Sequence, residues 1–136
     1  MRSWHIVEQL DEFTVEARVH QVGEDLLVVL WGGSRPHIGA VGLAEPRPSL
    51  KDPQRTSATS SVFTFAGHRE DSLAKDLAEE LARRLGRRVV VSAGMHWEGL
   101  TPEGIAKVTA LCGRFAARIV ENQHLPAGEG EKTGGI

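Results

Sequence analysis

The sequence has one cysteine, no tyrosine, and aromatic side chains at only 5% of its 136 positions. The single thiol, Cys112, has no partner for an internal disulfide, which excludes the small secreted domains held together by several bridges. Long apolar runs are also missing. The longest, Leu26 to Trp31, is far shorter than the roughly 20 residues of a membrane-spanning helix. The N-terminal segment lacks the apolar core of a signal peptide, so we expect a cytoplasmic protein.

An excess of charge of one sign is absent as well. The 16 basic and 18 acidic residues give a formal net charge of -2, which offers no overall attraction for nucleic acid or an anionic membrane. With 40% apolar and 25% charged residues, the composition is that of one folded domain. We expect a single α/β domain over residues 1–125. The polar, glycine-rich residues 126–136 are predicted to form a disordered tail.

Alternation of apolar and polar residues, or an uninterrupted apolar run, marks the strands. Four strands are predicted before the first helix, over residues 13–19, 26–31, 38–44 and 62–65. The run Leu26 to Trp31 has no polar face and is therefore predicted to be a central strand. Residues 45–60 contain three prolines and a Ser/Thr cluster, so we expect a long surface loop there.

The period becomes helical at Asp71 and the helix is expected to stop at Gly86. A buried strand follows over residues 88–91, and Thr101 is expected to cap a second helix. Its predicted core face consists of Ile105, Val108, Cys112, Phe115 and Ile119. The order β-β-β-β-α-β-α predicts an α/β (α+β) fold, a mostly antiparallel sheet with two helices packed on one face. The all-apolar strands favour burial of both sheet faces and hence a homo-oligomer.

Three segments place glycine and histidine at or just after a strand end. They are Gly32-Gly33-Ser34-Arg35-Pro36-His37-Ile38-Gly39, Gly67-His68-Arg69, and Gly94-Met95-His96-Trp97-Glu98. If the strands are neighbours, the three segments would form one pocket, because strand ends gather loops along one edge. Each segment also has a simpler interpretation, as a bulge and turn, a helix cap or a solvated loop.

The residue types in these segments are compatible with two kinds of chemistry. Arg35 and Arg69 could grip a phosphate or carboxylate, and Trp31 and Trp97 could stack on a flat ring. Alternatively, the three histidines could bind zinc at a site with an open position. Cys112 lies on the predicted apolar helix face, where an inert thiol is expected rather than a nucleophile.

At these same residues the sequence resembles the LpdD-like prenylated-flavin chaperones, the D subunits of gallate and hydroxyarylic acid decarboxylases. The resemblance spans roughly residues 23–112, and its most specific element is Pro36-His37-Ile38-Gly39 after a buried strand. The family's third element commonly reads Gly-Ile-His, then a small or aliphatic residue, then Asp-Asn. This chain has Gly94-Met95-His96-Trp97-Glu98-Gly99 there, with Glu in place of Asp.

The resemblance implies a non-catalytic accessory protein for a prenylated-FMN-dependent aromatic acid decarboxylase, with the modified flavin or a UbiD-like decarboxylase large subunit as its partner. It implies no catalytic residue in this chain. The residues that would bind the cofactor are Gly32, Gly33, Arg35, His37, Gly39, Gly67, His68, Arg69, Gly94, His96 and Glu98. Two alternatives remain: a small enzyme with zinc on His37, His68 and His96, or a purely structural homo-oligomer.

Overall fold

The computed structural model describes residues 2–65 and 71–123, and within these ranges the chain forms six strands and two helices. In chain order they are β1 (Ser3–Leu10), β2 (Phe13–Val22), β3 (Asp25–Gly33), β4 (Ala40–Pro48), β5 (Thr56–Thr64), α1 (Asp71–Leu85), β6 (Val89–His96) and α2 (Pro102–Asn122). The predicted tail, residues 126–136, lies outside the described residues. No helix in the described ranges is long and apolar enough to cross a membrane.

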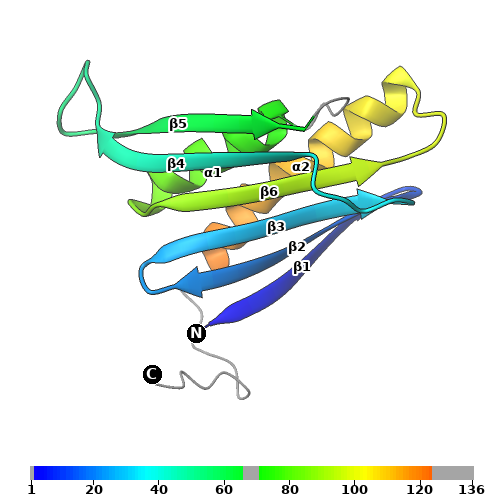
Figure 1. Cartoon of the computed structure of the whole chain (residues 1–136), viewed down its shortest axis with the longest axis horizontal. Coiled ribbons are helices and arrows are strands. Elements are labelled where there is room, and N and C mark those ends of the chain that lie inside the picture. Colours follow the sequence, from blue (N-terminus) through cyan, green and yellow to red (C-terminus); the bar gives the residue numbers. More distant parts are fainter. Residues whose placement is uncertain (1, 66–70, 124–136) are drawn as a thin grey trace.

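The strands form one sheet in the order β1-β2-β3-β6-β4-β5. All neighbours are antiparallel except β3 and β6, which pair in parallel because β6 inserts between two strands that are consecutive in sequence. Both helices lie on the same face of this sheet, behind it in Figure 1. The predicted fold class is confirmed: a mostly antiparallel sheet with two helices on one face.

The hydrophobic core lies between the sheet and the helices. In β3 the side chains of Leu26, Val28 and Leu30 are at most 2% exposed and face the helices. Helix α1 covers β4, β5 and β6, whereas α2 covers β1 and β2. Val29 and Trp31, on the opposite face of β3, are only half-buried in the single chain. The predicted burial of both faces is therefore not achieved within one chain.

The predicted order lacks the first strand, β1. Its residues Trp4, Ile6, Glu8 and Leu10 pair with inward-facing positions of β2. Glu8 interrupts what would otherwise be an apolar alternation, and this hides the strand pattern in the sequence. In the structure the Glu8 carboxylate accepts a bond from Arg118 Nη1 of α2 at 2.8 Å, so an inward charge is neutralised there.

The predicted loop over residues 45–60 is wrong. Strand β4 continues to Pro48 and β5 begins at Thr56, leaving residues 49–55 as the connection. Prolines are tolerated in β4 because β6 pairs with it only as far as Ala44. Beyond that point Pro46 and Pro48 have β5 on one side and none of the six described strands on the other, so the N–H that proline lacks is not needed by a second neighbour.

Helix boundaries are closer to prediction. Leu85 ends α1, and Gly86 follows with a φ of +63°, as expected of a C-terminal glycine. The Thr101 hydroxyl caps α2 by accepting the Gly104 N–H at 3.0 Å. The predicted core face of α2 is correct except for Ile105, which is 53% exposed. In the first turn, Gly104 rather than Ile105 is turned toward Phe13 of β2.

Candidate functional site

The three strands that precede the predicted segments, β3, β5 and β6, finish at the same end of the sheet. β3 and β6 are parallel, and β4 is antiparallel to both β6 and β5, so β3, β5 and β6 all run in one direction (Figure 1). The segments Gly32–Gly39 and Gly94–Glu98 therefore meet, as the sequence predicts. The third predicted segment, with Gly67, His68 and Arg69, lies outside the described residues.

The segment from Ser34 to Gly39 crosses the end of β6 to reach β4. At its start the Ser34 N–H donates to the His96 carbonyl at 2.8 Å, and at its end the Gly39 N–H donates to the Ala93 carbonyl at 3.0 Å. Between these bonds the crossing chain lies directly on Gly94, where a Cβ would fall 1.7 Å from the His37 carbonyl oxygen. Glycine at 94 is thus required by a backbone crossing.

Gly33 is held just as tightly at the end of β3. It has a φ of +81°, a conformation that side chains with a Cβ disfavour. A Cβ there would also fall 1.9 Å from the His96 carbonyl oxygen. Gly33 therefore allows β3 to leave the sheet beside His96, and this turn carries Arg35 toward the loop after β6.

Arg35, His96 and Glu98 form a hydrogen-bonded group at this end of the sheet. The Arg35 Nη2 donates to Glu98 Oε1 at 2.6 Å and lies 2.9 Å from His96 Nε2. The same His96 Nε2 is 3.1 Å from Glu98 Oε1. The Arg35 and Glu98 side chains are 68% and 75% exposed, so their ion pair adds little to stability and both groups are accessible to a ligand.

The protonation of His96 decides which of these bonds forms. An arginine can only donate, so the contact with Arg35 requires an unprotonated His96 Nε2 that accepts. A proton on Nε2 would instead be donated to the Glu98 carboxylate. Hydrogen bonds from His96 and then from Arg35, together with their positive charges, hold the pKa of Glu98 below its ordinary value of 4.5. Glu98 is therefore a carboxylate at neutral pH.

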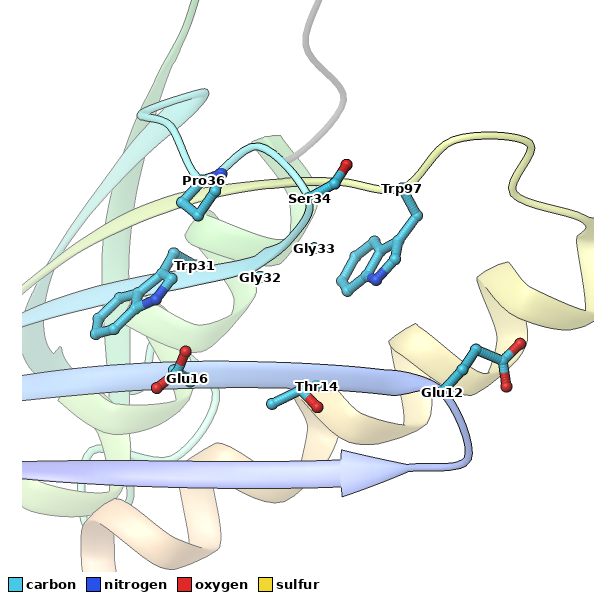
Figure 2. A pocket seen from close by; sticks show the side chains of 9 residues that line it. All are labelled: Glu12, Thr14, Glu16, Trp31, Gly32, Gly33, Ser34, Pro36 and Trp97. Carbon is cyan, nitrogen blue, oxygen red and sulfur yellow. The ribbon is translucent and has the colours of Figure 1, made fainter.

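A cavity of about 350 Å³ opens beside this group. Figure 2 shows its floor at Gly32 and Gly33, with the indoles of Trp31 and Trp97 on either side. Trp97 packs edge-on against Phe13, with ring centroids 5.6 Å apart, and its ring also lies against Gly32. Trp31 stacks on His5, with centroids 5.7 Å apart and an interplanar angle of 8°. The cavity volume is at the lower end of the range for small-molecule sites.

The strand opposite the glycines contributes polar groups to the cavity. Thr14 and Glu16 lie on the outward face of β2, and Glu12 lies just before this strand (Figure 2). The Glu16 carboxylate also lies 2.9 Å from His5 Nε2. Two carboxylates on one wall make the cavity a place for N–H donors and a poor place for a phosphate. The nearest cationic group on the crossing segment is Arg35, between the lining residues Ser34 and Pro36.

Two of the three predicted zinc ligands, His37 and His96, lie in the described residues. His37 donates from Nδ1 to the Arg35 carbonyl at 2.9 Å, and His96 contacts Arg35 and Glu98. Over residues 2–65 and 71–123, no group of three or more His, Cys, Asp or Glu side chains is placed to hold a metal ion. His68, the third predicted ligand, lies outside these ranges.

The comparison of this sequence with known families decides its classification. The family described as the prenylated flavin chaperone LpdD-like domain matches residues 9–124, most of the chain. The chain belongs to this family. The resemblance stated from the sequence is thereby confirmed, and the family supports an accessory chaperone role for this LpdD-like protein.

Individual relatives agree with this classification. Protein LpdD of Lactiplantibacillus plantarum is 25% identical over 108 residues, which cover 79% of this chain and 76% of that protein. A chain from the crystal structure of a chaperone complex for yeast 20S proteasome assembly matches with a TM-score of 0.52 and 9% sequence identity. The match covers 85% of this chain and 99% of the yeast chain. At 9% identity this likeness shows a shared fold alone.

Sequence reasoning missed part of the cavity of this LpdD-like chain. Its alternation places Thr14 and Glu16 on the solvent-facing side of a strand, yet no local signal shows that this face borders the glycine turn. Glu12 is missed because the strand before it was missed. Trp31, at the end of the apolar run that predicts a central strand, lies on the face away from the helices and lines the cavity.

Proposed function

We propose that this chain is a non-catalytic accessory chaperone that binds prenylated FMN for a UbiD-like aromatic acid decarboxylase. Membership of the prenylated flavin chaperone family supports a role with this flavin. The observation that carries the site is the cavity lined by both Trp31 and Trp97 at the end of β3. Under this proposal the decarboxylation chemistry belongs to the flavin bound in the large subunit, and this chain supplies only binding and positioning.

The cavity fits a flat, nitrogen-rich ring better than it fits a phosphate. Indole faces stack on aromatic ring systems, and both Trp31 and Trp97 line the cavity. The carboxylates of Glu12 and Glu16 can accept hydrogen bonds from ring N–H groups. The cavity of about 350 Å³ would hold the ring portion, with the rest of the cofactor extending along the crossing segment.

The phosphate would then bind at Arg35 and His96, outside the cavity. Arg35 is presented at the surface and is already oriented by its bond to Glu98. A phosphate offers the guanidinium stronger, bidentate acceptors and would take the place of Glu98. In this arrangement Glu98 holds Arg35 in position while the ligand is absent, and the glutamate's extra methylene relative to aspartate extends its reach.

Anaerobic native mass spectrometry and tryptophan fluorescence test this proposal directly. Adding prenylated FMN is expected to give a mass increment equal to the cofactor and to quench the fluorescence of the two cavity tryptophans. Plain riboflavin, which has no phosphate, is expected to bind more weakly. Arg35→Ala should weaken binding of prenylated FMN about 10- to 100-fold, because a charge-assisted phosphate contact is lost. Trp31→Ala should also weaken binding and remove part of the quenching.

Two matched variants control for the loss of any arginine and of any tryptophan. Arg47→Ala removes an arginine that is bonded to Thr59 in the far part of the β4–β5 hairpin and should leave binding unchanged. Trp4→Phe removes the third tryptophan, which lies on the helix side of β1, and should leave the quenching unchanged. The same spectra recorded with the apo decarboxylase test direct binding to the large subunit. A chain that binds neither the flavin nor the decarboxylase would overturn the proposal.

A further inference from the structure

The face of the sheet turned away from the helices is apolar at its centre, and no helix or strand formed by residues 2–65 and 71–123 covers it. We call it the open sheet face. It consists of Leu27 and Val29 of β3, Val90 and Ser92 of β6, Val41 and Leu43 of β4, and Phe63 of β5. We propose that a second copy of this chain covers this face, so that two sheets pack face to face in a homodimer.

Strand pairing shows that the apolar side chains are contiguous. One row across the sheet contains Val29, Ser92, Val41 and Phe63, which are successive partners on β3, β6, β4 and β5. The neighbouring row contains Leu27, Val90 and Leu43 on β3, β6 and β4.

Several of these side chains are open to solvent in the single chain. Leu43 is 46% exposed and Phe63 is 62% exposed, and Phe65 at 47% packs edge-on against Phe63. Large exposed side chains that adjoin one another on a rigid sheet are typical of a contact surface rather than of free solvent exposure.

The size of the face suits a dimer of this small chain. Strands of 8 to 10 residues in a six-stranded sheet span roughly 25 Å in each direction, at about 3.3 Å per residue and 4.8 Å per strand. The open sheet face and the surrounding rim on all six strands together therefore offer on the order of 700 Å², close to the roughly 800 Å² that each partner contributes to a stable interface.

The charges around the face are compatible with a copy of itself. Its centre has no ionisable side chain, whereas the rim carries both signs. Arg18 and Glu16 of β2 lie along one border of the open sheet face. Glu45 pairs with Arg88 at 3.8 Å along another border of the same face. An uncharged centre with a mixed rim is the usual anatomy of a protein interface, and it allows one patch to face its own copy without net repulsion. A near-continuous apolar strand such as β3 is likewise typical of strands covered on both faces.

Sedimentation velocity at micromolar concentration tests this inference. The wild type is expected to sediment as a species of twice the 14.8 kDa chain mass. The double variant Leu43→Asp/Phe63→Asp should sediment as a monomer, its dissociation constant raised at least about 100-fold, because each carboxylate would be buried without a partner. Both residues are largely exposed in the single chain, so the monomer should keep its fold, which circular dichroism and thermal unfolding would verify.

Ile105→Asp is the matched control. Ile105 is 53% exposed, similar to the two test positions, but it lies on α2, on the other side of the sheet. This variant should remain a dimer. A monomeric wild type, a dimer that survives the double variant, or a dimer lost only in Ile105→Asp would each overturn the inference. Capture of the decarboxylase by a monomeric wild type through this face would assign the surface to that partner instead. Flavin binding is measured separately, so either proposal can fail alone.

Discussion

Gly94 and His37 are in direct backbone contact, because the chain that leaves β3 passes over the end of β6 at this point. A Cβ on Gly94 would lie 1.7 Å from the His37 carbonyl oxygen and 3.0 Å from the Gly39 nitrogen. The contact explains why a Pro-His-Ile-Gly element and an Ala-Gly-Met-His element occur in one sequence. They are the two sides of a single crossing, and Arg35 and His96 are brought together by it.

Replacing Gly94 by alanine should therefore force this crossing apart. We expect Gly94→Ala to lower the free energy of unfolding by about 1–3 kcal/mol, as overpacking does in a tight contact. Gly113→Ala provides the control, since nothing lies within 4 Å of a Cβ at Gly113 in α2. That substitution should stabilise the protein by about 0.5–1 kcal/mol through helix propensity. Urea titration of both variants measures the difference, and equal effects would show that the crossing is loose.

The charge state of Glu98 should depend on both of its partners. Its pKa lies below 4.5 in the folded chain, so its contribution to stability is present above pH 4.5 and disappears as the pH falls through the lowered pKa. His96→Ala and Arg35→Ala should each raise this pKa toward 4.5, with the larger rise in His96→Ala because the hydrogen bond from His96 is the largest cause. Carboxyl-carbon NMR titration of Glu98 follows this shift. Identical midpoints in wild type and both variants would contradict the three-residue group.

Replacement of each cavity tryptophan by alanine should lower the free energy of unfolding by a different amount. Trp97 packs against Phe13 and the core cluster, so Trp97→Ala should lower the free energy of unfolding by about 2–3 kcal/mol. Trp31 lies beside the open sheet face, on the side of the sheet away from the helices, and stacks on His5, so Trp31→Ala should cost about 1 kcal/mol or less in the monomer. Denaturant unfolding of the dissociated protein makes the comparison. A greater loss from Trp31→Ala than from Trp97→Ala would reverse this assignment.

Cys112 should be unreactive while the chain is folded. Burial in α2 raises its pKa to about 12, so only on the order of one thiol in ten thousand is ionised at pH 8. Ellman's reagent should label it slowly in the native protein and rapidly in guanidinium chloride. Labelling of the native protein at the rate of a free thiol would show that the core opens around α2. The thiol is therefore not available as a nucleophile while the chain is folded.

Local patterns in the sequence were sufficient for most of the elements. The alternation from Phe13 to Val19 predicts β2, and the four-residue leucine period with Gly86 predicts α1 and its end. Such patterns work because burial of one strand face or one helix stripe acts on neighbouring residues in the chain. They fail where a distant residue compensates for a local violation. Glu8 is tolerated in β1 because Arg118 reaches it, and Pro46 is tolerated in β4 because β6 has already ended.

The sequence by itself also determined the family and the residue types available to the site, since Gly33, His37, Gly94 and His96 are recognisable from their order in the chain. Tertiary structure alone decided how they combine. The insertion of β6 between β3 and β4 brings Arg35 to His96 and Glu98, and it sets Trp31 across a glycine floor from Trp97. Residues about 60 positions apart meet here through strand pairing, a long-range choice made by the packing of the whole sheet.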